Sequence, residues 1–462
     1  MTFAVDIVLP TLFNMVLRIL SIRFPSFHTA LAVGVALSLS VGRSFAQTPV
    51  INTNPPALPP TDTLKLTINQ ADEQFKAHNL TVLATQLGIS ENKAYEIQSQ
   101  LRVNPAVYVE TMPYNQQTRE LLPFKQTNAQ QVVQVQQLIR LAGKRNKQLA
   151  IARTNTELAA DRFYDLLRTL TYQLHTTFYD LFYARQTLNV YNQEIATLQQ
   201  TVSLYQQQFD KGNVPLKDLT RLKAYLFSLT TERQQLLRRL IDDQADLVVL
   251  LNTSPTAAIQ PVVAPEALDR FTINSLNVST LVQLAEQNRF DLKGYRDLAK
   301  QEQQNLTLQR AMAVPDLTLQ GTYDRNGSYI PNYFGVGVGI SLPVLNKNQG
   351  NIQAAKVRIQ SSQQLMSAYV LQVDSDVEKA FTKAVQTEQL YRTFDQRFND
   401  DFGRLIDGVT TNYKKQNIDV VEFLDFFDSY KSSQIQFAQL QNDRMQSMEE
   451  VNFAVGTNPF QK

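Results

Sequence analysis

Cysteine and tryptophan are missing from this chain of 462 residues. Without a thiol, the chain can form no disulfide bond, no cysteine-based zinc site and no lipid-modified N-terminal cysteine, and thiol catalysis is excluded. Histidine is also scarce, with three residues, and there are seven methionines. These numbers leave no cluster of soft ligands for a transition metal, so we expect neither a bound metal nor a cofactor.

Catalytic patterns are missing as well. The sequence contains no Ser-His-Asp grouping, no P-loop and no paired acids of the kind that a catalytic pocket uses. His78 and His175 fall on predicted helices without supporting neighbours, and the Gly-x-Gly-x-Gly run at 335–339 lacks the spacing of a dinucleotide-binding loop. We therefore do not expect an enzyme.

The N-terminus has the pattern of an export signal. Arg18, Arg23 and His28 precede the apolar run TALAVGVALSLSV, and the small residues SFA follow it. We predict a signal peptide over residues 1–46, and translation could begin at Met15 because the stretch ahead of the apolar run is long. A membrane anchor is less favoured because the run is short. After it, no apolar run reaches the ~20 residues of a spanning helix.

The balance of charge disfavours one class of partner. Residues 1–46 hold three of the 44 basic residues and one of the 42 acidic residues, so the rest of the chain has no net charge. Proteins that bind nucleic acid need a basic surface. We therefore expect no nucleic-acid partner.

In the remaining chain the same order of elements occurs two times. This internal repeat is stronger evidence for the fold than any single motif. Each copy has a short helix, a moderate helix that stops before Pro105 or Pro315, two extended segments, a very long helix, a turn and a return helix. From the long helices onward the copies match at an offset of 204 residues. The predicted parts are a Pro-rich segment 47–63, a first repeat 64–252, a linker 253–279, a second repeat 280–456 and a tail 457–462.

The long helices are the strongest local signal. Neither glycine nor proline occurs from Lys144 to Lys211, and apolar residues recur every three or four positions. A helix of this length spans on the order of 100 Å and needs partner helices along all of it. The aromatic run FYDLFYA at 178–184 follows the same spacing and should pack between helices. The predicted long helices cover 144–209, 216–251, 348–412 and 420–455.

Four segments alternate between apolar and small or polar residues, as membrane strands do. Each has about the 9–11 residues that a tilted membrane strand needs. Four strands cannot close a barrel, and an open sheet edge cannot face lipid, so closure requires other copies. Two chains would give eight strands and three would give twelve. The sequence thus predicts a mainly α-helical fold with a membrane β-barrel portion, with strands at 105–112, 131–141, 315–324 and 333–343.

In this order of elements the chain resembles the TolC family of outer-membrane efflux proteins, from about residue 64 to 456. Two stretches resemble the heavy-metal (CusC/CzcC-like) branch of that family. One is LAGKRNKQLAIA at 141–152, and the other is GVGISLPVLNKNQGNIQAA at 337–355. The matching positions in the second stretch are Pro343, Asn346, Asn348, Gln349, Gly350, Ile352 and Ala355.

The resemblance implies a homotrimer with a twelve-stranded barrel in the outer membrane and a helical tunnel in the periplasm. It also implies docking to a periplasmic adaptor (a membrane fusion protein) and to an inner-membrane pump of the resistance-nodulation-division type. The expected function is an efflux duct for metal cations or small toxic compounds. Two alternatives stay open: an outer-membrane factor for type I protein secretion, and a periplasmic coiled-coil structural protein.

The two turns between long and return helices have matching sequences. FDKGNVPLKDLTRLK, which begins at Phe209, aligns without a gap with YKKQNIDVVEFLDFF, which begins at Tyr413. The resemblance makes these turns the adaptor-docking tips, whereas the simpler interpretation is that they only close the hairpins. The candidate docking residues are Gly212, Asn213, Val214, Leu216, Asn417, Ile418 and Val420.

Glu422 and Asp425 stand three residues apart, hence on one face of the return helix. They occupy the places of the family's acidic entrance residues, so a trimer would hold six carboxylates around a periplasmic gate that favours cations. The simpler interpretation is that acids are favoured near a helix N-terminus. Candidate counter-charges are Lys414, Lys415 and Arg221, and candidate hinge residues are Gly403 and Gly408.

Overall fold

The computed structural model of the chain describes residues 63–116, 118–121, 129–264, 273, 276–326, 330–393, 405, 408–413, 415 and 417–460. The predicted signal peptide, nearly all of the Pro-rich segment, Gly403 and Lys414 lie outside the described residues. Residues 60–462 form one compact unit. The two repeats are therefore packed together and are not separate domains.

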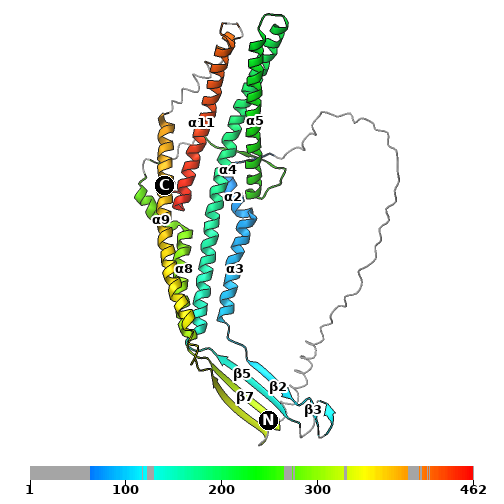
Figure 1. The fold of residues 1–462 in the computed structure, drawn as a ribbon, viewed down its shortest axis with the longest axis vertical. Coiled ribbons are helices and arrows are strands. Elements are labelled where there is room, and N and C mark those ends of the chain that lie inside the picture. The colour runs from blue at the N-terminus through cyan, green and yellow to red at the C-terminus, as the bar shows by residue number, and fades with distance from the viewer. Residues whose placement is uncertain are drawn as a thin grey trace, which may run out of the picture. The chain divides into compact units, whose positions relative to one another are not determined.

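Helices make up most of the described chain and occur in the same order twice (Figure 1). The first repeat has α2 (Ile68–His78), α3 (Leu80–Gln100), α4 (Lys144–Asp210) and α5 (Leu216–Leu251). The second has α7 (Val278–Asn288), α8 (Phe290–Met312), α9 (Gln349–Thr393) and α11 (Val420–Val455). Both bounds of α2 and α7 differ by 210, and both bounds of α5 and α11 differ by 204. The predicted mainly helical fold is confirmed.

Helix α4 has 67 residues, so it is about 100 Å long at 1.5 Å per residue. Glycines bound it on both sides: Gly143, with φ of 65°, is its N-cap, and Gly212, with φ of 77°, follows its end. Glycine adopts such angles without steric cost, because it has no Cβ. In the second repeat, α9 is described to Thr393 and residues 408–413 are helical. The rest of the helix predicted over 348–412 lies outside the described residues.

Four strands form one antiparallel sheet at the end of α4 where that helix begins (Figure 1). The order is β2 (Ala106–Thr111), β5 (Gln131–Ile139), β7 (Leu317–Asn326) and β8 (Pro331–Ile340). Within the described chain, the outer edges of β2 and β8 have no partner strand. The connection between β2 and β5 covers 112–130, whereas that between β7 and β8 covers only 327–330. This difference is larger than the change of offset between the repeats, because β7 is longer than β2 and the segment before α9 is longer than the segment before α4.

The register of this sheet gives it two different faces, because directly paired residues lie on the same face. Val107 pairs with Val135, Val135 with Gly321, and Gly321 with Val336, so one apolar row crosses all four strands. On the other face Gln134 donates from Nε2 to Oε1 of Gln320 at 3.0 Å. The predicted alternation is confirmed, with one apolar and one polar face.

Two short parallel strands, β1 (Thr63–Leu66) and β6 (Ala258–Pro261), pair beside the middle of α4 and the C-terminal part of α5. The predicted linker 253–279 therefore contains a short strand. Ile259 is buried, and Pro261 ends the strand where its missing N–H costs no hydrogen bond. A second pair, β3 (Tyr114–Asn115) and β4 (Glu120–Leu121), lies in the β2–β5 connection.

Each repeat has its own apolar core at this level. The first core packs Phe75 of α2 against Phe178 of α4 and Leu247 of α5, and most of the aromatic run 178–184 is buried in it, as predicted. The second core packs α7, α9 and α11 around residues such as Leu281 and Val451. Among the described residues, no helix combines the length and apolarity needed to cross a membrane.

Candidate functional site at the hairpin tips

The two hairpin turns have the same hydrogen bonds as well as similar sequences. Asn213 donates from its backbone N to the Gln208 carbonyl oxygen at 2.9 Å and from Nδ2 to Gln208 Oε1 at 2.7 Å. In the second turn Asn417 makes the corresponding bonds to Asn412, at 2.9 Å and 3.3 Å. Each asparagine thus bonds to the residue five positions before it, near the end of the long helix. Both repeats therefore form this turn with the same pair of hydrogen bonds.

The return helices begin differently. The N-cap of α5 is Pro215, which forms no side-chain cap. The N-cap of α11 is Asp419, whose Oδ1 accepts from the backbone N of Val421 and Glu422 at 2.8 and 2.9 Å. Asp419 therefore caps the N-terminus of α11. At this position the acid has the role expected of an acidic residue at the start of a helix.

Beneath the tips, four aromatic rings join the two hairpins. Tyr205 of α4 stacks on Tyr413 at a centroid distance of 5.0 Å, and Tyr413 stacks on Phe423 of α11 at 4.1 Å. Phe427 follows at 5.2 Å from Phe423. These rings belong to one buried cluster that also includes Leu222 of α5. The sequence pattern alone does not reveal this cluster, because its members come from both repeats.

The candidate docking residues differ in their exposure. Gly212, Asn213 and Asn417 are exposed, and Val214 and Ile418 are half-buried. Leu216 is 60% exposed and presents an apolar surface beside the first turn. Val420 is only 4% exposed, because it packs into the aromatic cluster, so its prediction as a surface contact is wrong. The next residue, Val421, is exposed instead.

Glu422 and Asp425 both lie on the exposed side of α11, opposite the buried Phe423 and Phe427. Arg221 and Lys415 are exposed too, but within the described part of the chain neither forms an ion pair with either carboxylate. The structure therefore leaves these two acids facing outward without a counter-charge from Arg221 or Lys415. Gly408 is helical and exposed.

A buried lysine links the two hairpins further along the helices. Lys431 of α11 lies 3.2 Å from Glu232 of α5 and 2.9 Å from Asp428, measured from Nζ to the carboxylate oxygens. Tyr225 of α5 donates to Asp428 Oδ1 at 3.0 Å. Nearby, burial raises the pKa of Glu194 of α4 to about 8, although the charge of Lys431 acts in the opposite direction. We name Lys431, Glu232, Asp428 and Tyr225 the hairpin clamp.

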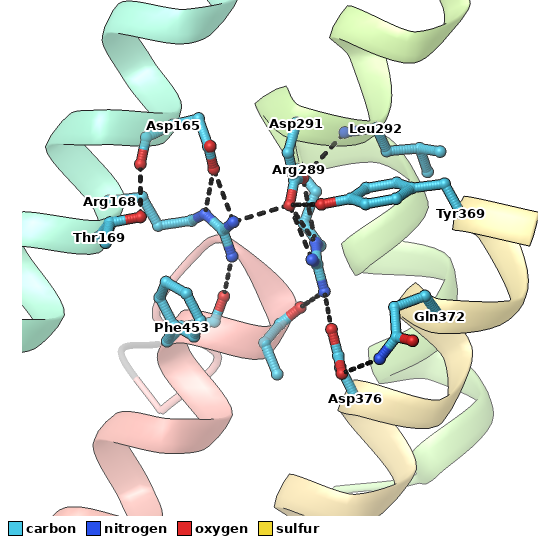
Figure 2. A network of polar contacts seen from close by, with 11 residues as sticks. Asp165, Arg168, Thr169, Arg289, Asp291, Leu292, Tyr369, Gln372, Asp376 and Phe453 are labelled. Atoms are coloured by element: carbon cyan, nitrogen blue, oxygen red, sulfur yellow. Dashed lines mark hydrogen bonds and ion pairs between the residues drawn. The ribbon is translucent and has the colours of Figure 1, made fainter. Parts of the chain in front are cut away.

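A second polar network lies at the level of the repeat cores and connects four helices (Figure 2). Arg168 of α4 contacts Asp291 of α8 at 2.8 Å, and Arg289, at the start of α8, contacts Asp291 at 2.7 Å and Asp376 of α9 at 3.2 Å. Tyr369 of α9 donates to Asp291 at 2.7 Å. Three groups therefore converge on one carboxylate. We name this group of residues the core network.

The core network also holds the end of α11. Arg168 donates to the Phe453 carbonyl oxygen at 2.6 Å, and Arg289 donates to that of Ala454 at 3.4 Å. Cations at a helix C-terminus are favoured by the helix dipole. Burial alone would raise the pKa of Asp291, but the hydrogen bond from Arg289, the charge of Arg168 and the bond from Tyr369 lower it to about 2.

His175 proves to be supported by neighbours, contrary to the sequence interpretation. Its Nε2 lies 2.9 Å from Asp72 Oδ1 of α2, and its Nδ1 lies 3.0 Å from Glu449 Oε2 of α11. Burial works against the charged ring, but the hydrogen bond to Asp72 and the interactions with the Glu449 and Asp72 carboxylates raise the pKa of His175 to about 10. The imidazolium is therefore a structural bridge between helices. Among the described residues, no group of three or more acids and histidines could hold a metal ion.

Solved structures of outer-membrane channels share this fold. The structure of the channel OprN aligns over 86% of this chain and 91% of its own, with 16% identity and a TM-score of 0.66. CmeC of Campylobacter jejuni aligns over 84% and 85%, with 13% identity and a TM-score of 0.69. CusC aligns over 84% and 92%, with 14% identity and a TM-score of 0.68. These similar values do not single out the heavy-metal branch.

Comparison with curated protein sequences gives no match. The sequence itself does match one family description, over the part that contains the second repeat. Residues 281–457 match the family described as outer membrane efflux protein. The chain therefore has the fold of the TolC-like outer-membrane channels, and its second half has the sequence pattern of the outer membrane efflux protein family.

Proposed function

We propose that the chain is one subunit of an outer-membrane duct for efflux, which closes as a homotrimer. The observation that carries this proposal is the four-stranded sheet, which has one apolar face, one polar face and two unpaired edges. Such a sheet is stable in lipid only when its edges pair with other copies. Three copies would give a barrel of twelve strands, and the polar faces would line its lumen.

The helices suit a tunnel that continues this barrel. Helix α4 begins five residues after β5 ends, and it carries the chain on the order of 100 Å away from the sheet. In the proposed assembly, a signal peptide over residues 1–46 is removed on export, the barrel lies in the outer membrane, and the helices enclose a tunnel in the periplasm. The family match over 281–457 supports efflux over the other roles of this architecture.

The tips are the proposed site for a periplasmic adaptor, which would connect the duct to an inner-membrane pump of the resistance-nodulation-division type. Exposed Leu216 and the two exposed turns offer a small apolar and polar surface for this contact. Glu422 and Asp425 would form a ring of six carboxylates in the homotrimer. Such a ring concentrates cations, which fits metal cations or small cationic toxic compounds as cargo.

The test is conductance of the purified protein in planar bilayers. Wild-type protein should run as a heat-sensitive assembly on gels and should conduct with a preference for cations. The double variant Glu422→Gln with Asp425→Asn should conduct with a reduced preference for cations, because the ring charge is lost. The matched control is Asp246→Asn with Glu378→Gln, two exposed acids that form no ion pair within the described chain.

The two parts of the proposal fail separately. Protein that sediments as single chains and never conducts would contradict the duct. Normal conductance with an unchanged ion preference in the Glu422/Asp425 variant would leave the duct intact and contradict the gate.

A further inference from the structure

The junction between the sheet and the helices is strongly basic. The four segments that pass through it are 101–105, 140–147, 310–316 and 341–350, and together they contain seven lysines and arginines and one acid. That acid, Asp316, is paired with Lys144 at 2.7 Å. Because residues 47–462 have no net charge, this concentration of one sign is a local feature of the junction.

Three of these cations line one cavity of about 510 Å³. They are Arg102, from the segment before β2, Arg140, directly after β5, and Arg145, in the first turn of α4. No acidic residue lines the cavity, and within the described residues none of the three arginines has a carboxylate within ion-pair distance. The cavity therefore has an uncompensated positive charge.

Neighbouring groups position Arg140 and the segment that carries Arg102. Gln137 donates from Nε2 to the Val103 carbonyl oxygen at 2.9 Å, which ties the segment that carries Arg102 to β5. Arg140 donates from Nη1 to Gln148 Oε1 at 2.8 Å. The N-terminus of α4 adds to the positive potential, because its N-cap Gly143 makes no side-chain bond and its first turn has no acid.

The other lining residues of the cavity are partly apolar, and the cavity adjoins the apolar face of the sheet. Leu101, Val103 and Ile139 line it beside the arginines. Ile139 pairs with Leu317, and Leu317 with Ile340, so Ile139 belongs to the same face as Val135 and Val336. A ligand bound here would meet positive charge at one end and an exposed apolar surface at the other.

We propose that this cavity binds the phosphate group of a phospholipid, with the acyl chains lying against the apolar face of the sheet. The proposal rests on the proposed function, because that function places the junction at the periplasmic surface of the outer membrane. Arginine guanidinium groups match phosphate oxygens in geometry and charge. The site would hold the barrel at its depth in a chain that has no cysteine for a lipid anchor.

The test measures lipid binding to the full-length assembly in detergent by thermal shift and native mass spectrometry. The probe is dioleoylphosphatidylglycerol, and dioleoylglycerol and inorganic phosphate are compared at the same concentrations. Each arginine should contribute about fivefold, so the triple variant Arg102→Gln, Arg140→Gln, Arg145→Gln should bind the lipid about 100-fold more weakly. The matched control replaces three exposed arginines elsewhere, Arg162, Arg238 and Arg358, by glutamine and should bind as the wild type does.

A second variant separates lost charge from lost folding. Lysine at all three positions keeps the charge but loses the paired hydrogen bonds of the guanidinium, so it should bind more weakly than the wild type and more tightly than the glutamine variant. Three results would each overturn the proposal. The lysine and glutamine variants could lose lipid binding equally, or dioleoylglycerol could bind as tightly as dioleoylphosphatidylglycerol. Inorganic phosphate could also raise the unfolding temperature as much as the lipid does. Bilayer conductance of the triple variant should remain, so that absence of lipid binding in a conducting protein contradicts only this inference.

Discussion

At the scale of single residues, the structure depends on a few buried charges that are fully paired. Asp291 is 8% exposed and accepts from two arginines and a tyrosine that belong to different helices. A buried ion pair contributes little net stability compared with an apolar contact, but removal of one partner leaves an uncompensated charge. Loss of Asp291 should therefore destabilise the core network, because it leaves two arginines without their common carboxylate.

Replacement of Asp291 by asparagine should lower the free energy of unfolding by about 3 kcal/mol, because Arg168 and Arg289 lose their common carboxylate. The pKa of Asp291 is lowered from 3.8 to about 2, so its contribution to stability is present above pH ~4 and is lost as the pH falls toward 2. The variant should lack this part of the acid dependence, measured by thermal unfolding between pH 2 and pH 7.

The control for this change is Asp376→Asn, which removes a carboxylate of the same network that is 35% exposed. Its cost should be about 1 kcal/mol, since an exposed partner is better solvated. Equal costs for the two variants would contradict the central role of Asp291.

These contacts could not be predicted from the sequence. Asp72 is 103 residues from His175, and Arg168 is 123 residues from Asp291. A sequence pattern reports only on neighbours along the chain, so His175 was interpreted as unsupported. Val420 was assigned to the surface for a similar reason, because the cluster that buries it includes Leu198 of α4 and Leu222 of α5, which are about 200 residues away along the chain.

At the scale of elements, local sequence decided most of the structure. The absence of glycine and proline predicts α4, and α5 and α11 have the bounds that the repeat predicts. The strands were found because β7 and β8 alternate over ten residues each, and shorter or less regular alternation occurs at the corresponding places of the first repeat. Strands β1 and β6 were missed, because each has only four residues and is stabilised by pairing with the other far along the chain.

Glycines near the end of the second long helix predict a place where it bends during opening. Gly408 is helical, and a Cβ added there would meet nothing within 4 Å, so packing does not require glycine. Alanine at Gly403 and Gly408 should leave the assembly as heat-stable as the wild type or more so, because alanine favours helix by about 1 kcal/mol. The fraction of time that the channel is open in bilayers should fall.

A matched control is Gly88→Ala in α3, where an added Cβ also meets nothing within 4 Å. This variant should open as the wild type does. If the variant with alanine at both 403 and 408 also opens normally, then these glycines are not a hinge.

At the scale of the whole molecule, the open sheet is the feature that calls for other copies. Strands β2 and β8 are separated by β5 and β7, so their axes are about 14 Å apart at the ~4.8 Å spacing of neighbouring strands, and their outer edges face away from each other. One chain cannot bring these edges together without curling its sheet into a barrel of four strands, which is too small to close. The edges are therefore available to neighbouring chains.

The absence of cysteine makes this arrangement easy to test. A chain with Val107→Cys on β2 and one of Val336→Cys, Val338→Cys or Ile340→Cys on β8 has no other thiol. At least one pair should crosslink under oxidation into covalent dimers and trimers on denaturing gels, because disulfides need Cα atoms within about 7 Å. Single-cysteine variants should stay monomeric on the same gels, and failure of every pair would contradict the proposed closure.

In the proposed assembly, the unequal connections of the sheet would affect whatever approaches the protein from outside the cell. At the helical end, both repeats present turns with the same asparagine bonds, so a ring of three chains would offer six nearly equivalent positions. At the opposite end, three connections of residues 112–130 would alternate with three short ones at 327–330. A phage or an antibody would thus meet true threefold symmetry, and escape from such agents should select changes in the longer connection.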